Sequence, residues 1–598
     1  MTHSQVNSAI ASKHGLLKSL WLHILPQRRK QFVWLLTLML VSSIAELVSI
    51  SAVLPFLGVL SSPERMFGHP TLQPLVQLLN LKTPDSLLIP LTILFGLAVL
   101  IANAIRLLLL WVSTRLAFAT GADLGLEIFR RTLYQPYSVH ISRNSSTLID
   151  AVSNKSQGVI GGVIYPIVVM VSSGLMLVII VGALILYKPL ISILSFAGFG
   201  CLYFLISRLT RFRLLANSEL VATQSTIRVK ALQEGIGGIR DLLLDGTQSA
   251  YCTIFNEADR KMRRAQAQNS FINQSPRYLM EVFGIIFILI IATWVTLKSD
   301  GIGSALPTMG LLALAAQRLL PMMQQFYQGW SSFKGHHGTL IEILELLEQP
   351  LPEHLLAPPQ TPLPFNCKID LDAVSFRYHP KSSWVLNKIT LSIPKGSRIG
   401  IVGTTGSGKS TLLDIIMGLL IPTHGRILID GIVIGEANAR SWQAHIAHVP
   451  QTIFLSDDSI AQNIAFGVPP SDIDMLRVEQ AANQAQLSTT IAALADGYQA
   501  HVGERGVQLS GGQRQRVGIA RALYKAADVI VLDEATSALD NTTEANVMHA
   551  IEGLSREITL FIIAHRHSTL GFCDFIVDLN NGNAELKLVD TTLKTVSL

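Results

Sequence analysis

Eight consecutive residues in the second half of the chain have the composition and spacing of a loop that wraps around phosphate groups. They follow the apolar run 399–402 and match G-x-x-x-x-G-K-[ST]; they are Gly403, Thr404, Thr405, Gly406, Ser407, Gly408, Lys409 and Ser410. Glycines let backbone N–H groups close around phosphate oxygens, and the helix expected to start near Thr411 adds its positive end. Lys409 is expected to reach the β- and γ-phosphates, and Ser410 to coordinate Mg²⁺. The segment predicts a P-loop, with Thr411 also counted among its nucleotide-binding residues.

Two carboxylates follow a second apolar run, 529–532. Asp533 and Glu534 would lie at the carboxyl end of a buried strand, where a phosphate site opens in a parallel sheet. Asp533 is expected to hold Mg²⁺, directly or through water, and Glu534 to polarise the attacking water as a general base. Two acids after an apolar run are often only a solvated strand end. After a P-loop, however, they predict hydrolysis of a nucleoside triphosphate.

Residues 509–513 read LSGGQ, and on this segment the chain resembles the ATP-binding-cassette (ABC) superfamily. The resemblance implies that Ser510, Gly511, Gly512 and Gln513 meet the γ-phosphate of ATP held on the P-loop of the opposite protomer. A serine and two glycines at a helix N-terminus form an anion nest, which suits that role. One chain supplies one P-loop and one signature, so the resemblance implies a homodimer with two composite ATP sites. A heterodimer with a related half stays open.

Four further residues match ABC motifs one at a time. The resemblance implies that Tyr378, in VSFRY, stacks on adenine and that Gln451, in HVPQ, senses Mg²⁺ and the membrane domain. It also implies that Asp540, in SALD, reaches between protomers and that His565, in FIIAHRHST, contacts the γ-phosphate. The expected catalytic residues are then Glu534, His565 and Gln451, and the expected metal-site residues are Ser410, Gln451 and Asp533.

The first 330 residues or so have the composition of a membrane protein. Of the 598 residues in the chain, 49% are hydrophobic and only 15% are charged. Soluble domains are about a quarter charged, so an ordinary soluble enzyme is excluded. Apolar stretches long enough to cross about 30 Å of hydrocarbon recur at 31–60, 86–114, 158–187, 189–207, 277–297 and 302–328. They predict a polytopic α-helical membrane domain of six transmembrane helices.

Lysine and arginine are distributed unevenly between these stretches. The N-terminal segment and the connections 115–157 and 208–276 are rich in them, whereas the other connections hold only Arg65, Lys82, Lys188 and Lys298. Cytoplasmic loops normally hold the excess, so both termini are expected on the cytoplasmic side of a bacterial inner membrane. Membrane topology then explains the net charge of +6, and no nucleic-acid partner is expected.

A proline-rich stretch, 349–364, separates the membrane region from one in which short Val/Ile runs alternate with helical segments. The predicted organisation is a cytoplasmic elbow at 1–30, a six-helix exporter domain with long cytoplasmic helical extensions at 31–335, a linker at 336–365 and an α/β P-loop ABC ATPase domain at 366–598. Six spans followed by one cassette resemble the half-transporter layout of type IV ABC exporters.

Three arginines, Arg106, Arg277 and Arg318, interrupt the apolar stretches. At ~1.5 Å per helical residue they lie roughly 24–31 Å below the outer edge of the membrane, in its cytosolic half. Arginine facing lipid is costly, so a polar cavity shared by two copies would hold six such charges, which suit a phosphate or pyrophosphate headgroup. The structural alternative is that Arg277 pairs with Glu281, four residues on, and that arginines near the interface extend to water. Glu46 is either a packed polar anchor or cavity lining.

Within the superfamily, the membrane half most resembles the bacterial flippases of lipid-linked oligosaccharides for N-glycosylation. The resemblance lies in SSIAELVSISAVLPFLGVL of the first span, RYLMEVFG at the fifth and LLALAAQRLLP in the sixth. It implies that Arg106, Arg277 and Arg318 bind a polyprenyl-diphosphate-linked oligosaccharide, which ATP-driven alternating access moves across the membrane. Expected cofactors are ATP and Mg²⁺, and expected partners are a second copy and membrane lipid. An exporter of another lipid, a drug or a peptide, or an ATP-gated regulator, remains the alternative.

Overall fold

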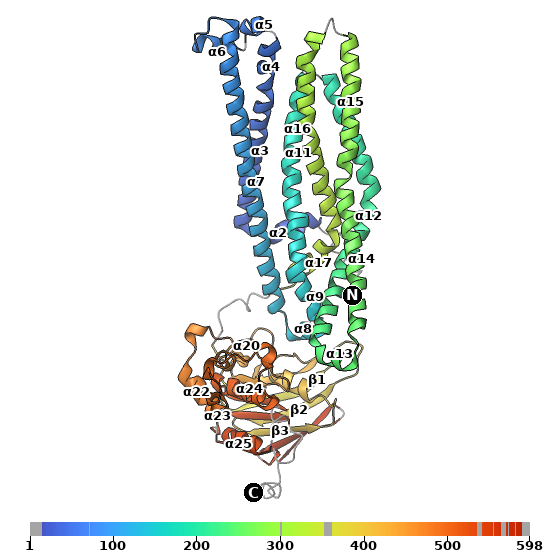
Figure 1. Cartoon of the computed structure of the whole chain (residues 1–598). Coiled ribbons are helices and arrows are strands. Elements are labelled where there is room, and N and C mark those ends of the chain that lie inside the picture. Colours follow the sequence, from blue (N-terminus) through green and yellow to red (C-terminus); the bar gives the residue numbers. More distant parts are fainter. Residues whose placement is uncertain are drawn as a thin grey trace. The chain divides into compact units, whose positions relative to one another are not determined.

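The computed structural model describes residues 15–588, apart from 62, 71, 188, 299–301, 352–360, 535–540, 554, 564–569, 572 and 581. The chain forms two compact units (Figure 1). The helical unit comprises Met1–Gln135 and Arg143–Pro350, and the α/β unit comprises Pro136–Ser142 and Leu351–Leu598. The short segment Pro136–Ser142, far from the cassette in sequence, therefore belongs to the α/β unit.

The helical unit is built on long helices that correspond to the six predicted spans. They are α3 (Pro26–Ser51) continued by α4 (Val53–Ser61), α7 (Leu88–Leu133), α11 (Tyr165–Tyr187), α12 (Pro189–Gly237), α15 (Pro276–Lys298) and α16 (Ile302–Gly335). Three of them begin at proline, which lacks the N–H that the first turn leaves unbonded. Within the described residues, three helical stretches are long and apolar enough to cross a membrane: Pro26–Leu60, Pro84–Leu133 and Ser145–Leu186.

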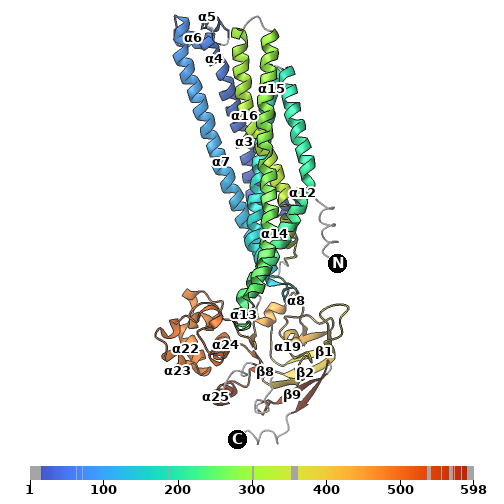
Figure 2. The ribbon, with the colours of Figure 1, turned by 45° about the vertical axis from the view of Figure 1, so that its right-hand side comes forward.

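Two of the long helices continue well past the length of a membrane span. Helix α7 has 46 residues and α12 has 49, against about 20 that cross the hydrocarbon. Both views show α12 beside α14 (Gln248–Gln274) (Figures 1 and 2). Shorter helices complete this part of the chain: α2 (Leu16–His23), α5 (Pro63–Phe67), α6 (Gln73–Leu78), α9 (Ser145–Asp150), α10 (Ser156–Val159), α13 (Ile239–Asp245) and α17 (His337–Leu347), with α8 (Tyr137–Ser142) in the α/β unit.

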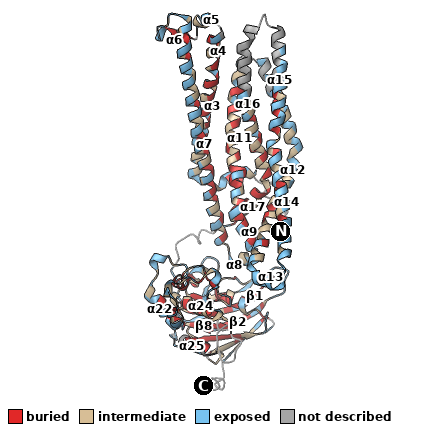
Figure 3. Ribbon diagram, viewed as in Figure 1, coloured by how far each residue is buried: buried red, intermediate tan, exposed pale blue. Residues whose placement is uncertain are grey.

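The outer surface of the helical unit is strongly apolar. Along α7, Leu100 and Ile93 are 68% and 57% exposed, and exposed and half-buried positions cover most of this helix (Figure 3). A water-soluble protein rarely exposes so large a patch of this kind, whereas lipid tails accommodate it without cost.

Glycines let the helices of the core approach closely. A Cβ on Gly329 of α16 would lie 2.6 Å from the carbonyl oxygen of Pro166, and one on Gly162 would meet the ring of His336. At Gly329 the backbones of α11 and α16 therefore approach closely, whereas Gly162 leaves room for the side chain of His336.

The predicted linker contains a packed helix. Helix α17 places Leu340, Ile343, Leu344 and Leu347 in the core of the helical unit, where each is at most 1% exposed. The helical unit then ends at Pro350, within the proline-rich stretch. The connection between the units is thus shorter than 336–365, because helical periodicity continues to Leu347.

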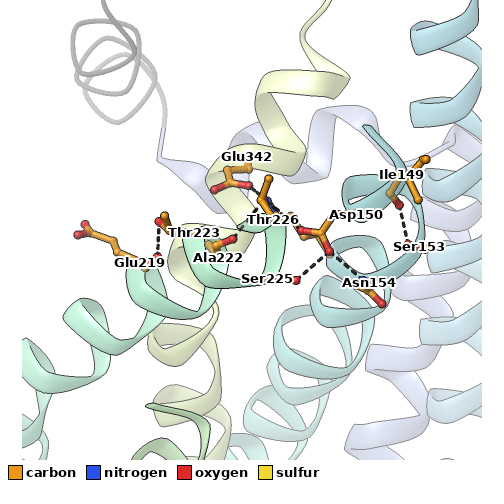
Figure 4. A network of polar contacts seen from close by, with 11 residues as sticks. Ile149, Asp150, Ser153, Asn154, Glu219, Ala222, Thr223, Ser225, Thr226 and Glu342 are labelled. Atoms are coloured by element: carbon orange, nitrogen blue, oxygen red, sulfur yellow. Dashed lines mark hydrogen bonds and ion pairs between the residues drawn. The ribbon is translucent and has the colours of Figure 1, made fainter. Parts of the chain in front are cut away.

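A buried ion-paired network joins three helices of the helical unit (Figure 4). Lys155 and Asp150 are 4% and 0% exposed, with 3.4 Å between Nζ and Oδ2. Lys155 also pairs with Glu342 of α17 and donates to Thr226 of α12. Asp150 accepts hydrogen bonds from Ser225 and Asn154, both at 2.8 Å.

The network depends on an unusual turn. Residues 150 and 155 are five apart, a spacing that an α-helix places on different faces. The segment Ala151–Lys155 is a π-turn, whose i→i+5 hydrogen bonds bring such residues together, and a second π-turn follows at Ile160–Ile164.

The α/β unit contains two sheets. The antiparallel sheet has the order β2 (Leu386–Pro394), β1 (Lys368–Phe376), β4 (His424–Ile429) and β5 (Ile432–Val433). The second sheet has the order β10 (Asn583–Leu588), β9 (Phe575–Asn580), β3 (Arg398–Gly403), β8 (Thr559–Ile563), β7 (Val529–Asp533) and β6 (Ile446–Val449). It is parallel from β9 to β6, and β10 is an antiparallel edge strand.

The second sheet is covered on both faces. Side chains alternate along its strands, so Val529 and Val531 face one core and Ile530 and Leu532 the other. The first core includes the antiparallel sheet and α19 (Lys409–Ile416). The second includes α21 (Ile460–Ile464), α22 (Met475–Gln484), α23 (Ser488–Ala492), α24 (Gly511–Lys525) and α25 (Asn541–Glu552), while α20 (Ala439–Gln443) adds Trp442 to the first. Helices α19 and α24 therefore lie on opposite faces.

Replacing Lys155 by Met is expected to lower the free energy of unfolding by about 3–5 kcal/mol, because it leaves the carboxylate of Asp150 buried without its cation. The double variant D150N/K155M is expected to recover most of this loss. Denaturation of the purified full chain in detergent measures both. The control is Lys230→Met, which breaks an exposed pair with Glu234 and is expected to change stability by no more than about 0.5 kcal/mol. Equal effects at Lys155 and Lys230 would contradict the role of the network.

Candidate functional site

The P-loop lies between β3 and α19, as the motif predicts. Gly408 has a φ of +100°, and a Cβ there would lie 3.1 Å from the carbonyl oxygen of Val385. At Gly403 a Cβ would lie 2.3 Å from the carbonyl oxygen of Leu579. The Nζ of Lys409 donates to the carbonyl oxygens of Gly403 (3.0 Å) and Thr404 (3.1 Å). The ammonium group is thereby held over the loop that its motif assigns to phosphate.

The predicted metal and catalytic residues meet at the carboxyl ends of the parallel strands. The Oγ of Ser410 lies 3.5 Å from Oδ2 of Asp533, and Nε2 of Gln451 donates to Oε2 of Glu534 at 2.7 Å. Glu534 has a φ of +50°, a left-handed conformation that costs energy for a residue with a Cβ.

The residues of this loop fit a triphosphate and Mg²⁺. The buried Oγ of Ser407 has no hydrogen-bond partner within the described residues, and phosphate oxygens would accept from it. Ser410 and Asp533 offer the oxygen ligands that Mg²⁺ prefers. The described part of the chain holds no group of three His, Cys, Asp or Glu that could bind a metal.

Tyr378 lies just after β1, beside the P-loop helix. Its hydroxyl is 3.0 Å from Oγ1 of Thr411, and its ring packs edge-on against Phe376 with centroids 5.0 Å apart. The side chain is 45% exposed, so one ring face is available to a base. Tyr137 of α8 lies close by: burial, the charge of Asp414 and the neighbouring Tyr378 all raise its pKa. No motif marks Tyr137, because it lies more than 200 residues before the cassette in the chain.

The LSGGQ residues form the start of α24. Ser510 caps this helix: Gln513 N donates to Ser510 Oγ at 3.2 Å, and Ser510 N donates to Gln513 Oε1 at 2.8 Å. Such a capping box fixes the helix N-terminus that Gly511 and Gly512 share. Since α24 and α19 lie on opposite faces of the sheet, the signature and the P-loop of one chain belong to different cores.

The structure does not describe three of the predicted site residues in full. Asp540 and His565 fall outside the described residues, and their roles stay predictions. Arg318 lies on α16, but its side chain is not among those described.

Arg106 and Arg277 line different pockets within one chain. Arg106 lines a pocket of about 580 Å³ between α3, α7, α11 and α16, together with Asn103, Gln325 and Gln328. Arg277 lines a pocket of about 260 Å³ and donates to Glu281 at 2.7 Å. In this structure Arg277 therefore pairs with Glu281, as the structural alternative predicts.

Other polar residues of the membrane-spanning helices were missed by sequence reasoning or left undecided. Glu46 is 1% exposed on α3, near buried Ser42 and Ser43, so it faces the interior of the helical unit. Gln325 and Gln328 escaped notice because uncharged amides hardly alter an apolar pattern. Their spacing of three on one helix was the signal that could have found them.

A parallel sheet with a P-loop, a signature on a separate helix and helices able to cross a membrane define a membrane-embedded ATPase. The chain matches the family described as ABC transporter transmembrane region over residues 32–317 and that described as ABC transporter over 386–537. The protein belongs to the ABC transporter family. It is an exporter half-transporter of the type IV fold and couples ATP hydrolysis to transport, so the predicted fold class and enzyme activity are confirmed.

Curated relatives of the chain include proteins named as lipid flippases. An ATP-dependent lipid A-core flippase of Cupriavidus metallidurans is 30% identical over 468 residues, which cover 76% of this chain and 77% of that protein. One from Cupriavidus pinatubonensis is 31% identical over 471 residues, with the same coverage. A solved structure of a bacterial Atm1-family ABC exporter with ATP bound shares the fold, with a TM-score of 0.77, 21% identity and coverage of 95% of this chain and 97% of that chain.

The carboxyl group of Asp414, on the P-loop helix α19, is expected to make the stability of the α/β unit depend on pH. Burial, together with the charge of Asp533, raises the pKa of Asp414 from 3.8 to about 6. Between about pH 4 and pH 6 the folded chain keeps a proton on Asp414 that the unfolded chain releases. The free energy of unfolding therefore falls as the pH rises through this range. Above pH 6 the ionised carboxylate destabilises the fold in full.

Replacing Asp414 by Asn is expected to raise the melting temperature at pH 7.5 by about 2–4 °C, which corresponds to ~1 kcal/mol after a discount for solvent screening. The gain is expected to shrink as the pH is lowered through 6 towards 4. Thermal unfolding of the nucleotide-free full chain measures it. Asp496→Asn, at an exposed site, is the control and is expected to have no such pH dependence. A lower melting temperature for D414N at pH 7.5 would show that the carboxylate stabilises the site.

Proposed function

We propose that the protein, as a homodimer in a bacterial inner membrane, flips a polyprenyl-diphosphate-linked oligosaccharide by ATP-driven alternating access. The observation that carries this proposal is Arg106, a cation on a membrane-spanning helix that lines a polar pocket inside the helical unit. Intramembrane cations are rare and mark substrate pathways, and a guanidinium binds phosphate oxygens in a bidentate manner. The distribution of Lys and Arg supports a cytoplasmic α/β unit and cytoplasmic termini.

Different residues of the α/β unit are proposed to bind the nucleotide, to hold Mg²⁺ and to activate water. Lys409 and the loop amides bind the β- and γ-phosphates, and Ser410 and Asp533 would hold Mg²⁺, which neutralises developing charge when bound. Glu534 orients and deprotonates water, and Gln451, hydrogen-bonded to Glu534, keeps that carboxylate in place. Asp540 and His565 are proposed to act on the same site by resemblance.

A second copy supplies the missing half of each site. The signature at the start of α24 belongs to a different core from the P-loop of its own chain. We propose that two α/β units face each other so that Ser510, Gly511 and Gly512 of one copy close on the nucleotide of the other. Closure would turn the helices from inward- to outward-facing, and hydrolysis would reset them.

Arg106 and Arg277 contribute differently to cargo binding. Within the described residues Arg106 has no carboxylate partner, whereas the charge of Arg277 is neutralised by Glu281. Arg106 therefore offers the stronger contact for a diphosphate, with Arg277 and Arg318 in supporting roles by resemblance.

A second candidate cargo is lipid A-core. It is favoured by the names of the relatives that match the chain over three quarters of its length. Reconstituted protein given either lipid distinguishes the two, because only the true cargo is moved at a rate that depends on ATP.

Replacing Glu534 by Gln is expected to reduce ATP hydrolysis at least 100-fold while ATP binding remains, because the amide cannot take a proton from water. Lys409→Ala is expected to lose ATP binding itself. Phosphate release and nucleotide binding by the purified full chain measure the two steps. Glu585→Gln, the same change at an exposed acid on β10, is the matched control and should keep normal hydrolysis. Near-normal hydrolysis by E534Q would refute the assignment of the general base.

Replacing Arg106 by Gln is expected to slow flipping of a polyprenyl-diphosphate-linked oligosaccharide at least tenfold, because a charge-assisted contact is lost, while ATP binding remains. The R106Q/R277Q/R318Q variant is expected to abolish it. Accessibility of the glycan on either side of proteoliposomes measures flipping. The control is Arg115→Gln, farther along α7, where the guanidinium lies over Trp111. Unchanged flipping by R106Q would remove the cargo proposal and leave the ATPase assignment intact.

A further inference from the structure

The geometry points to a sugar-binding subsite beside Arg106. We propose that Asn103, Gln325 and Gln328 bind the hydroxyl groups of a saccharide linked to the cargo lipid, next to the phosphate that Arg106 would bind. The inference rests on the proposed function for the choice of cargo and adds what the pocket recognises in it.

The pocket has the composition of a saccharide site rather than of a pure anion site. Among the described residues that line it, Arg106 is the one cation, and none is an acid. The uncharged polar lining residues come from three helices: Asn103 and Ser113 on α7, Tyr165, Ser172 and Ser173 on α11, and Gln325 and Gln328 on α16. Polar groups at this depth are costly to maintain without a role.

Asn103 offers an acceptor that a phosphate cannot use. Its Nδ2 donates to the carbonyl oxygen of Val99 at 2.8 Å. Because that carbonyl only accepts, the orientation of the amide is fixed and Oδ1 is left for another donor. Fully ionised phosphate has no proton to donate, whereas every sugar hydroxyl has one.

Gln325 offers the complementary donor. Its Oε1 accepts from Ser173 Oγ at 3.0 Å, so the N–H groups of Nε2 remain. Gln328 lies three residues on, on the same helix and in the same pocket. A saccharide hydroxyl both donates and accepts, and can therefore pair with Asn103 and the two glutamines together.

The remaining walls suit the carbon skeleton of a sugar. Leu107, Leu110, Val168 and Val169 line the pocket between the polar groups. A volume of about 580 Å³ is within the ~300–1,000 Å³ of small-molecule sites. One cation beside several neutral hydrogen-bonding groups thus matches a phosphate followed by a sugar.

The test measures binding of three lipids to the full chain in nanodiscs: a polyprenyl diphosphate with a glycan, the same polyprenyl diphosphate without sugar, and a neutral diacyl glycolipid. Gln325→Met and Gln328→Met remove the amides with little change in size. Each is expected to weaken binding of the glycosylated diphosphate about tenfold and of the sugar-free diphosphate less than twofold, because a site built to bind hydroxyl groups loses only that interaction. Gln274→Met is the matched control, because Gln274 is exposed at the end of α14 and lines neither pocket.

The outcomes separate this inference from the proposed cargo. Equal weakening of both diphosphates, or no weakening of either, overturns the sugar subsite. If the wild-type protein binds only the neutral glycolipid and Q325M and Q328M weaken that binding, the subsite stands and the diphosphate cargo is wrong. If none of the three lipids binds, both are wrong.

Discussion

The negative charge of a nucleoside triphosphate is the constraint on which the α/β unit depends. The P-loop answers it with backbone amides, a helix N-terminus and the ammonium group of Lys409, which its own loop carbonyls already hold in place. Hydrolysis also needs acids, and Asp533, which precedes Glu534 in the chain, lies 3.5 Å from Ser410 of the same loop. The charge of Asp533 also acts on its surroundings, since it helps to raise the pKa of Asp414. The site therefore combines a cation that binds phosphate, Lys409, with carboxylates that take part in its hydrolysis.

The helical unit meets the opposite constraint, because the lipid tails around it cannot form hydrogen bonds with an unpaired polar group. Its outer surface is apolar, and polar side chains either line a pocket with Arg106 or pair with each other, as Arg277 does with Glu281. Where the helices extend beyond the span, a fully buried charge becomes possible, as at Lys155, because two carboxylates and a hydroxyl surround it. Polar groups inside the membrane-spanning part are few, so each one there carries information about the cargo.

Local chemistry was predictable from the sequence, and contacts that depend on distant or irregular segments were not. The P-loop, the pairing of Ser410 with Asp533 and the cap at Ser510 follow from motifs that fix their own backbone. The contact of Arg277 with Glu281 follows from helical spacing. By contrast, Asp150 and Lys155 meet through a π-turn that no periodicity predicts, and α17 lies within the predicted linker 336–365 although it packs into the helical core. Tyr137 reaches the cassette from a segment more than 200 residues before it.

The separation of the P-loop and the signature is the reason why a dimer is proposed. Helix α19 is fixed by one core of the sheet and α24 by the other, so no small movement brings Ser510 to the loop of its own chain. In the proposed dimer, a second copy supplies the missing anion nest without disturbing either core. Nucleotide binding would then close a contact between two subunits, and this contact would drive the proposed change in the helical units. The same separation therefore suits a chain that works as half of a transporter.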